Sequence, residues 1–152
     1  MTSEKIYSEI QYEYSCSINK HPIFAENYHE ACVILNEELG EYAEEVCKGN
    51  RKKASVELKQ VASVCVRFVE MLESTENKNS INIKDVFSMT SDIRANTYDV
   101  WYANLAILTS NVGKINKYIY EYYREDGPID KVIEKLLYTI EVCKIILKNN
   151  CR

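Results

Sequence analysis

Hydrophobic residues recur every three or four positions along most of this chain, which is the period of an amphipathic helix. In the first such stretch Ile6, Ile10 and Tyr14 are spaced four apart, and this predicts a helix over residues 3–17. Pro22 favours a break soon afterwards, because proline disfavours α conformation in the residue before it.

Two longer amphipathic stretches follow, and we expect helices over residues 25–48 and 52–73. Gly49 and Asn50 lie between them, and the glycine suits the end of the first helix. Because so short a turn leaves no room for a crossing, the two helices must lie antiparallel. The apolar stripe of the first contains Leu35, Leu39, Tyr42 and Val46, and that of the second contains Leu58, Val61, Cys65, Phe68 and Leu72.

The second half of the chain predicts another helical hairpin. A polar segment at 74–80 precedes a short helix near 83–89, and a long helix then begins at 91 or 96 and continues to 123. Asp126, Gly127 and Pro128 form a firm break before a last helix at 129–148.

Composition agrees with helices, since four glycines and two prolines leave little room for the turns of an all-β fold. With 46% hydrophobic and 28% charged residues the chain is globular in character. We therefore predict an all-α bundle of about five helices built from antiparallel hairpins. It forms a single domain over 1–152, with one hairpin in 3–73 and a second in 83–150.

The two hairpins also resemble each other. Residues 34–41 overlay on 107–114 without gaps, and Val64-Cys65 falls on Val142-Cys143 if the second hairpin has a turn five residues longer. The hypothesis is a degenerate internal duplication that kept its packing and lost its acidic residues; the alternative is chance similarity between two amphipathic hairpins. In the overlay Glu37, Glu38, Glu41 and Glu57 correspond to Ser110, Asn111, Lys114 and Lys135.

Charge and cysteine content narrow the function classes. A net charge of −4 argues against a nucleic-acid partner, and no apolar run approaches the ~18 to 20 residues of a membrane span. The polar N-terminal stretch does not have the pattern of a signal peptide. The six cysteines include no C-x-x-C pair, which favours a reduced, cytoplasmic protein.

The side chains best suited to metal binding or catalysis are concentrated in the hairpin of residues 25–73. Five glutamates occur between positions 37 and 45, and Glu57 and Gln60 share a face of the following helix. An acidic helix face is usually just solvated, and this is the default interpretation. Against it, like charges three and four apart cost a few tenths of a kcal/mol per pair. A hard cation such as Mg²⁺ or Mn²⁺ would relieve that repulsion.

The spacing of these residues resembles a known signature. Glu37-Glu38-x-x-Glu41 followed by Glu57-x-x-Gln60 is similar to the E-E-x-x-E…E-x-x-D motif of the MazG-like all-α nucleotide pyrophosphohydrolases of phages and bacteria. Residues 6–10, 28–38 and 60–68 are similar to the surroundings of that motif, so that the resemblance covers 3–73.

The resemblance implies hydrolysis of a nucleoside triphosphate between its α and β phosphates, giving monophosphate and pyrophosphate. It implies that Mg²⁺ or Mn²⁺ is held by Glu38, Glu41, Glu57 and Gln60, with Glu37 and Glu41 as catalytic carboxylates. It also implies a homo-oligomer, either a homodimer or a dimer of pseudo-dimers.

Gln60 departs from the motif, which has aspartate there, and it removes one negative charge. The change leaves three alternatives open: weaker metal binding, a different number of metal ions, or lost activity. Two other functions therefore stay open: a weak or inactive homologue that senses a nucleotide or metal, and a structural interaction module that uses the tyrosine-rich second half.

Several basic and aromatic side chains are weaker candidates for contacts with phosphates or a base. For each there is a simpler explanation, namely a solvated turn, a surface ion pair or packing. They are Arg51, Lys52, Lys53, Lys59, Arg67, His29, Trp101 and the tyrosines at 98, 102, 118, 120, 122 and 123.

Overall fold

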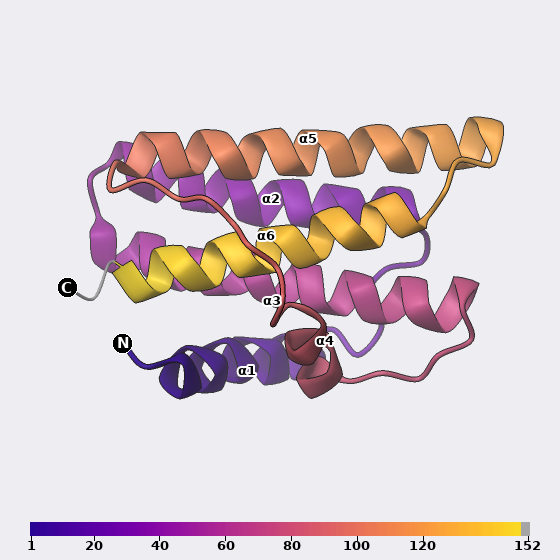
Figure 1. Ribbon diagram of the computed structural model, residues 1–152, viewed down its shortest axis with the longest axis horizontal. Coiled ribbons are helices and arrows are strands. Elements are labelled where there is room, and N and C mark those ends of the chain that lie inside the picture. Colours follow the sequence, from indigo (N-terminus) through magenta and orange to yellow (C-terminus); the bar gives the residue numbers. More distant parts are fainter. Residues whose placement is uncertain (150–152) are drawn as a thin grey trace.

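A computed structural model describes residues 1–149 of the chain, and within them it contains six helices and no strand. The predicted all-α bundle is confirmed, with the short fourth helix bringing the number from about five to six (Figure 1). The helices are α1 (Ser3–Lys20), α2 (Tyr28–Cys47), α3 (Arg51–Glu76), α4 (Ile83–Met89), α5 (Trp101–Glu125) and α6 (Asp130–Asn149).

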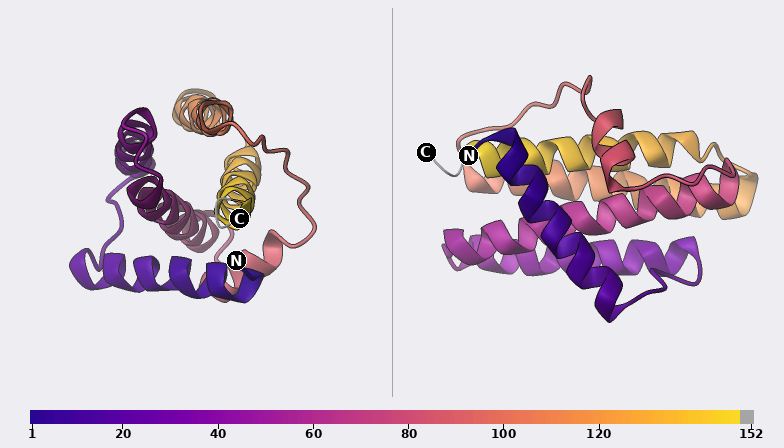
Figure 2. Two further views of the ribbon diagram at one scale, coloured as in Figure 1. Left: turned by 90° about the vertical axis from the view of Figure 1, so that its left-hand side faces the viewer. Right: turned by 90° about the horizontal axis from the view of Figure 1, so that it is seen from below.

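Four long helices form the bundle, and α1 lies across one side of it. The α2–α3 hairpin and the α5–α6 hairpin stand next to each other, as the end-on view shows (Figure 2). Large side chains from all four helices fill the space between them, including the fully buried Tyr42, Phe68, Leu108 and Ile140. Burying such side chains stabilises each helix far more than its own propensity does.

The turn between α2 and α3 is built by Gly49 and Asn50. Gly49 has a φ of 70°, and its N–H donates to the Val46 carbonyl, while the Asn50 N–H donates to the Glu45 carbonyl. These two bonds form a Schellman motif at the end of α2. The Asn50 side chain then accepts a hydrogen bond from the Lys53 N–H at the start of α3. One residue thus ends one helix and begins the next, which fixes the hairpin.

The two hairpins bury corresponding positions. On α5, the buried Leu108, Val112, Ile115 and Ile119 each lie 73 residues after the buried Leu35, Leu39, Tyr42 and Val46 of α2. On α6, the buried Val132, Leu136, Ile140, Cys143 and Ile146 each lie 78 residues after Ala54, Leu58, Ala62, Cys65 and Phe68 of α3. This agreement in burial supports the overlay that suggested an internal duplication.

The overlay needs five extra residues in the second hairpin, and the expectation that they lengthen the turn is wrong. Adding 73 to Cys47, the end of α2, gives 120, whereas α5 continues to Glu125. The extra residues therefore extend α5 by more than one turn, because they continue its helical pattern up to the break at Asp126. Asp126 has a φ of 52°, which closes the helix.

Several predicted helix boundaries also change. The third helix continues from 73 to Glu76, so residues 74–76 of the expected polar segment are helical. The first helix extends from 17 to Lys20, and the second begins at Tyr28 rather than 25 because the Asn27 side chain caps it by accepting from the Glu30 N–H. The long helix begins at Trp101, so residues 91–100 form an irregular segment that passes beside α6 (Figure 1). Here Asn104 holds the backbone of Tyr98 through two hydrogen bonds, which stabilises the irregular conformation.

Cys32, Cys65 and Cys143 are buried, as expected for cysteines that act as small hydrophobic residues, whereas Cys151 lies outside the described residues. No helix within residues 1–149 combines the length and hydrophobicity that a membrane crossing requires.

Candidate metal centre

Three glutamates from the α2–α3 hairpin converge on one point. Glu38 and Glu41 come from α2 and Glu57 from α3, and one carboxylate oxygen of each lies within 4.8 Å of the others. The two α2 residues share a face because they are three apart, and the tight turn at Gly49 sets Glu57 opposite them.

Gln60 lies beside the same carboxylates, one turn along α3 from Glu57. The orientation of its amide is assigned from its neighbours. With Nε2 toward the carboxylates, it donates to Glu38 Oε2 at 3.1 Å and to Glu57 Oε2 at 2.7 Å, whereas the opposite orientation sets the amide oxygen against carboxylate oxygens. The amide thereby links the two helices. To bind a cation held by these carboxylates, Gln60 would have to turn its amide and present the oxygen instead.

The accumulated charge changes the acidity of the cluster. Burial, followed by the negative charges of Glu41, Glu57, Glu37 and Glu13, raises the pKa of Glu38 from 4.5 to about 7. The pKa of Glu57 is raised as well, first by burial and then by the charge of Glu41 and a hydrogen bond with it. Glu38 is therefore partly protonated near neutral pH.

The nearest lysines on these helices do not neutralise the cluster. Lys48 pairs with Glu44 and Glu45 near the end of α2, and Lys59 pairs with Glu9 of α1 at 3.3 Å. Glu44 and Glu45 thus have Lys48 as a partner, while the charge of Glu45 still contributes to raising the pKa of Glu57.

The donor set suits a hard divalent cation. Carboxylate and amide oxygens are the ligands that Mg²⁺ and Mn²⁺ prefer, and oxygens within 4.8 Å of one another can share one ion. A bound cation would also offset the repulsion that raises the pKa of Glu38. Glu38, Glu41 and Glu57 thus fit such an ion, and Gln60 fits it only after its amide turns.

Glu37 lies outside the cluster, but it lines a groove of about 430 Å³ together with Glu38, Ile34 and Arg67. A smaller groove of about 230 Å³ reaches Glu38 and Gln60 from the α1 side, next to Glu13. The cluster can therefore be reached through two grooves in the surface. A substrate that carries phosphates needs such access.

Glu13 also contributes negative charge to the surroundings of the cluster, and the sequence did not indicate this. It belongs to α1, and its negative charge raises the pKa of both Glu38 and Glu57. Its distance along the chain gives no spacing signal; only the packing of α1 against α3 brings it near.

Several of the weaker candidates have packing roles. Arg67 is only 7% exposed, and its guanidinium donates to the carbonyls of Ser17 and His21 at the end of α1. His29 stacks on the ring of Tyr123 with centroids 4.3 Å apart. The Arg51 guanidinium lies 5.5 Å from the Trp101 ring centroid, which ties the α2–α3 turn to the start of α5.

Comparison with known proteins adds no relative to this description, since no family model, curated sequence or solved structure matches the chain. What the fold and the site define is an all-α bundle with a carboxylate cluster open to the surface.

Proposed function

We propose that this protein hydrolyses a nucleoside triphosphate to the monophosphate and pyrophosphate with the help of Mg²⁺ or Mn²⁺. The observation that carries the proposal is the convergence of Glu38, Glu41 and Glu57, with Gln60 beside them, in the order and spacing of the MazG-like motif. A solvated acidic face gives no reason for residues on two helices to gather their oxygens at one point.

The three carboxylates and, once turned, the Gln60 amide would hold the cation. When bound, the cation would supply charge neutralisation for the phosphates and a more acidic water. Glu37 is exposed and lines the same groove as Glu38, so it would accept the proton from the attacking water. Glu41 would serve as a ligand of the cation and as a catalytic carboxylate beside Glu57.

A second candidate is a weak or inactive homologue that senses a nucleotide or a metal ion. The observation that favours it is Gln60, whose amide nitrogen faces the carboxylates and supplies no negative charge. A purely structural module remains the third candidate. The homo-oligomer and the cytoplasmic location stay predictions; sedimentation and imaging of a tagged chain would test them.

The proposed reaction is tested by pyrophosphate release from ribo- and deoxyribonucleoside triphosphates with Mg²⁺ or Mn²⁺. Wild type should release pyrophosphate, and Glu41→Gln should lower the rate by about a hundredfold or more, because a metal ligand and its charge are lost. Glu44→Gln is the matched control, since Glu44 lies on the same helix but pairs with Lys48, and it should keep wild-type activity.

If the wild-type protein cleaves none of these nucleotides, the proposed hydrolytic function is excluded. In that case Mn²⁺ binding, measured by electron paramagnetic resonance, separates the other candidates: loss of binding in Glu41→Gln identifies a sensor, and absence of binding in wild type leaves the structural module.

A further inference from the structure

The α5–α6 hairpin carries a second groove, separate from the carboxylate cluster. It has a volume of about 590 Å³, and its apolar wall includes Ile107. None of its lining residues lines the grooves beside Glu38, and the two hairpins occupy opposite sides of the bundle (Figure 2). Its polar and aromatic lining consists of Tyr98, Ser110, Asn111, Lys114, Lys135 and Tyr138.

This groove occupies the position that the carboxylate cluster has on the first hairpin. With the offsets of 73 and 78 that match the buried positions, Glu38, Glu41, Glu57 and Gln60 correspond to Asn111, Lys114, Lys135 and Tyr138, all of which line the groove. Two of the positions that hold carboxylates on α2–α3 thus hold lysines on α5–α6. The charge of the site is inverted.

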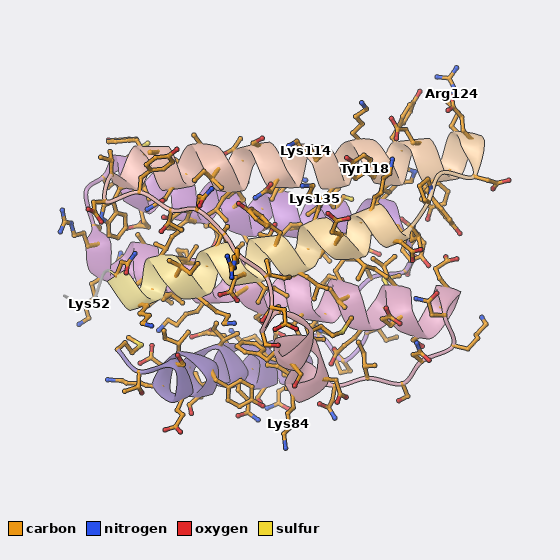
Figure 3. The ribbon with its side chains drawn as sticks, viewed as in Figure 1. Lys52, Lys84, Lys114, Tyr118, Arg124 and Lys135 are labelled. Carbon is orange, nitrogen blue, oxygen red and sulfur yellow. The ribbon has the colours of Figure 1, made fainter. Side chains whose placement is uncertain are left out.

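Lys114 on α5 and Lys135 on α6, labelled in Figure 3, both line this groove. Among residues 1–149 neither ammonium has a carboxylate within ion-pairing distance, and the Lys135 ammonium lies 5.6 Å from the Tyr138 ring centroid. Two like charges without a counter-charge favour binding of an anion, just as the glutamate cluster favours a cation.

Asn111 provides an independent indication of a ligand. Its side chain lines the groove, is 5% exposed, and its Nδ2 has no hydrogen-bond partner. A buried amide without a partner costs about 1 to 3 kcal/mol, so such groups normally find one. Nδ2 is itself buried, so an anionic oxygen in the groove would become its acceptor once the amide turns toward the groove.

We propose that this groove binds a phosphorylated small molecule that also has a flat aromatic group, as a nucleotide does. Lys114, Lys135, Asn111 and Ser110 supply ammonium, amide and hydroxyl donors for phosphate oxygens. Tyr98 and Tyr138, with the apolar wall, face the aromatic group, and the volume is within the range of ordinary small-molecule sites. The proposal is independent of the hydrolysis proposed above, because it uses neither the carboxylates nor a metal ion.

The test is calorimetric titration at low ionic strength with excess EDTA, which leaves the carboxylate cluster without a divalent cation. The probes are ATP, inorganic phosphate and adenosine. The double variant K114Q/K135Q is compared with K52Q/K84Q, which changes the net charge equally at two exposed lysines on other helices (Figure 3).

Wild type should bind ATP, phosphate should compete with it, and adenosine alone should bind at least about tenfold more weakly. K114Q/K135Q should lose about tenfold affinity per lysine, since a hydrogen bond to a charged group contributes about that much. K52Q/K84Q should stay within about twofold of wild type. Asn111→Leu, which leaves the charge unchanged, should also weaken ATP binding.

Three results would overturn the proposal: no binding of ATP by wild type, equal losses in the two double variants, or adenosine binding as tightly as ATP. If K114Q/K135Q does not show the wild-type circular dichroism spectrum, Asn111→Leu decides alone, and wild-type affinity in that variant rejects the site.

Discussion

Gln60 is the residue on which the chemistry of the first hairpin depends. With the orientation assigned to its amide, Gln60 holds Glu38 and Glu57 together through its amide nitrogen. The MazG-like motif has a fourth carboxylate at this position. Gln60 therefore stabilises the cluster when no cation is bound. It also makes the cluster a weaker set of ligands for a cation. The two effects can be separated by one substitution.

Gln60→Asp should bind Mn²⁺ about tenfold more tightly than wild type, because an added negative charge faces the ion. In EDTA the same variant should unfold more easily, by about 1 kcal/mol, because a fourth carboxylate meets Glu38 and Glu57 without a counter-charge. Titration with Mn²⁺ and urea unfolding measure both. Gln11→Asp, on the exposed face of α1, is the control and should change neither.

The raised pKa of Glu38 predicts a pH dependence of stability. The folded chain keeps the Glu38 proton up to about pH 7, whereas the unfolded chain releases it near 4.5. The folded state thus binds more protons in that window, and its stability should fall as the pH rises through it. In EDTA, Glu38→Gln should therefore gain stability relative to wild type between pH 5 and pH 8. A constant difference across that range would contradict the assigned cause.

At the scale of the element, the helices follow from local patterns that the chain carries in its sequence. The stripe from Leu35 to Val46 and the Gly49–Asn50 turn predicted the α2–α3 hairpin nearly as it is. The errors fall where a cap or a long-range contact decides the boundary, as at Asn27 and in residues 91–100. Periodicity alone does not contain those contacts.

The role of Gly49 in the α2–α3 turn can be tested by comparing the stability of three glycine-to-alanine variants. Gly49→Ala should destabilise the protein by about 1 kcal/mol or more, because its φ of 70° strains any residue with a Cβ. Gly40→Ala and Gly113→Ala should stabilise it by about 0.5 to 1 kcal/mol each, because both lie inside helices with no atom within 4 Å of an added Cβ. Urea unfolding of the three variants checks the signs.

At the scale of the whole molecule, two hairpins of like packing and opposite charge form one bundle. Their buried positions correspond, and their exposed grooves differ, so that one presents carboxylates and the other lysines. Packing constrains the buried faces of both hairpins, because a change of volume there is costly. The outward grooves are free of that constraint, and the chemistry changes there.

The shared core predicts that the hairpins unfold together. Leu35→Ala and Leu108→Ala, at corresponding positions that are both 0% exposed, should each destabilise the chain by about 2 to 5 kcal/mol in a single transition. Val33→Ala, at a side chain 65% exposed, should change stability by about 0.5 kcal/mol at most. A separate transition for one hairpin in thermal unfolding would show two independent units.

The sequence by itself determined the helices, the buried stripes and the tight α2–α3 turn, because each depends on residues close together in the chain. Tertiary structure decided which distant side chains meet: Glu57 joins Glu38 and Glu41, and Arg67 is buried against α1. It also decided that Asn111, Lys114 and Lys135 share a groove. The rotation and axial position of each helix depend on its packing against all neighbouring helices together. The spacing of residues along the chain does not determine them.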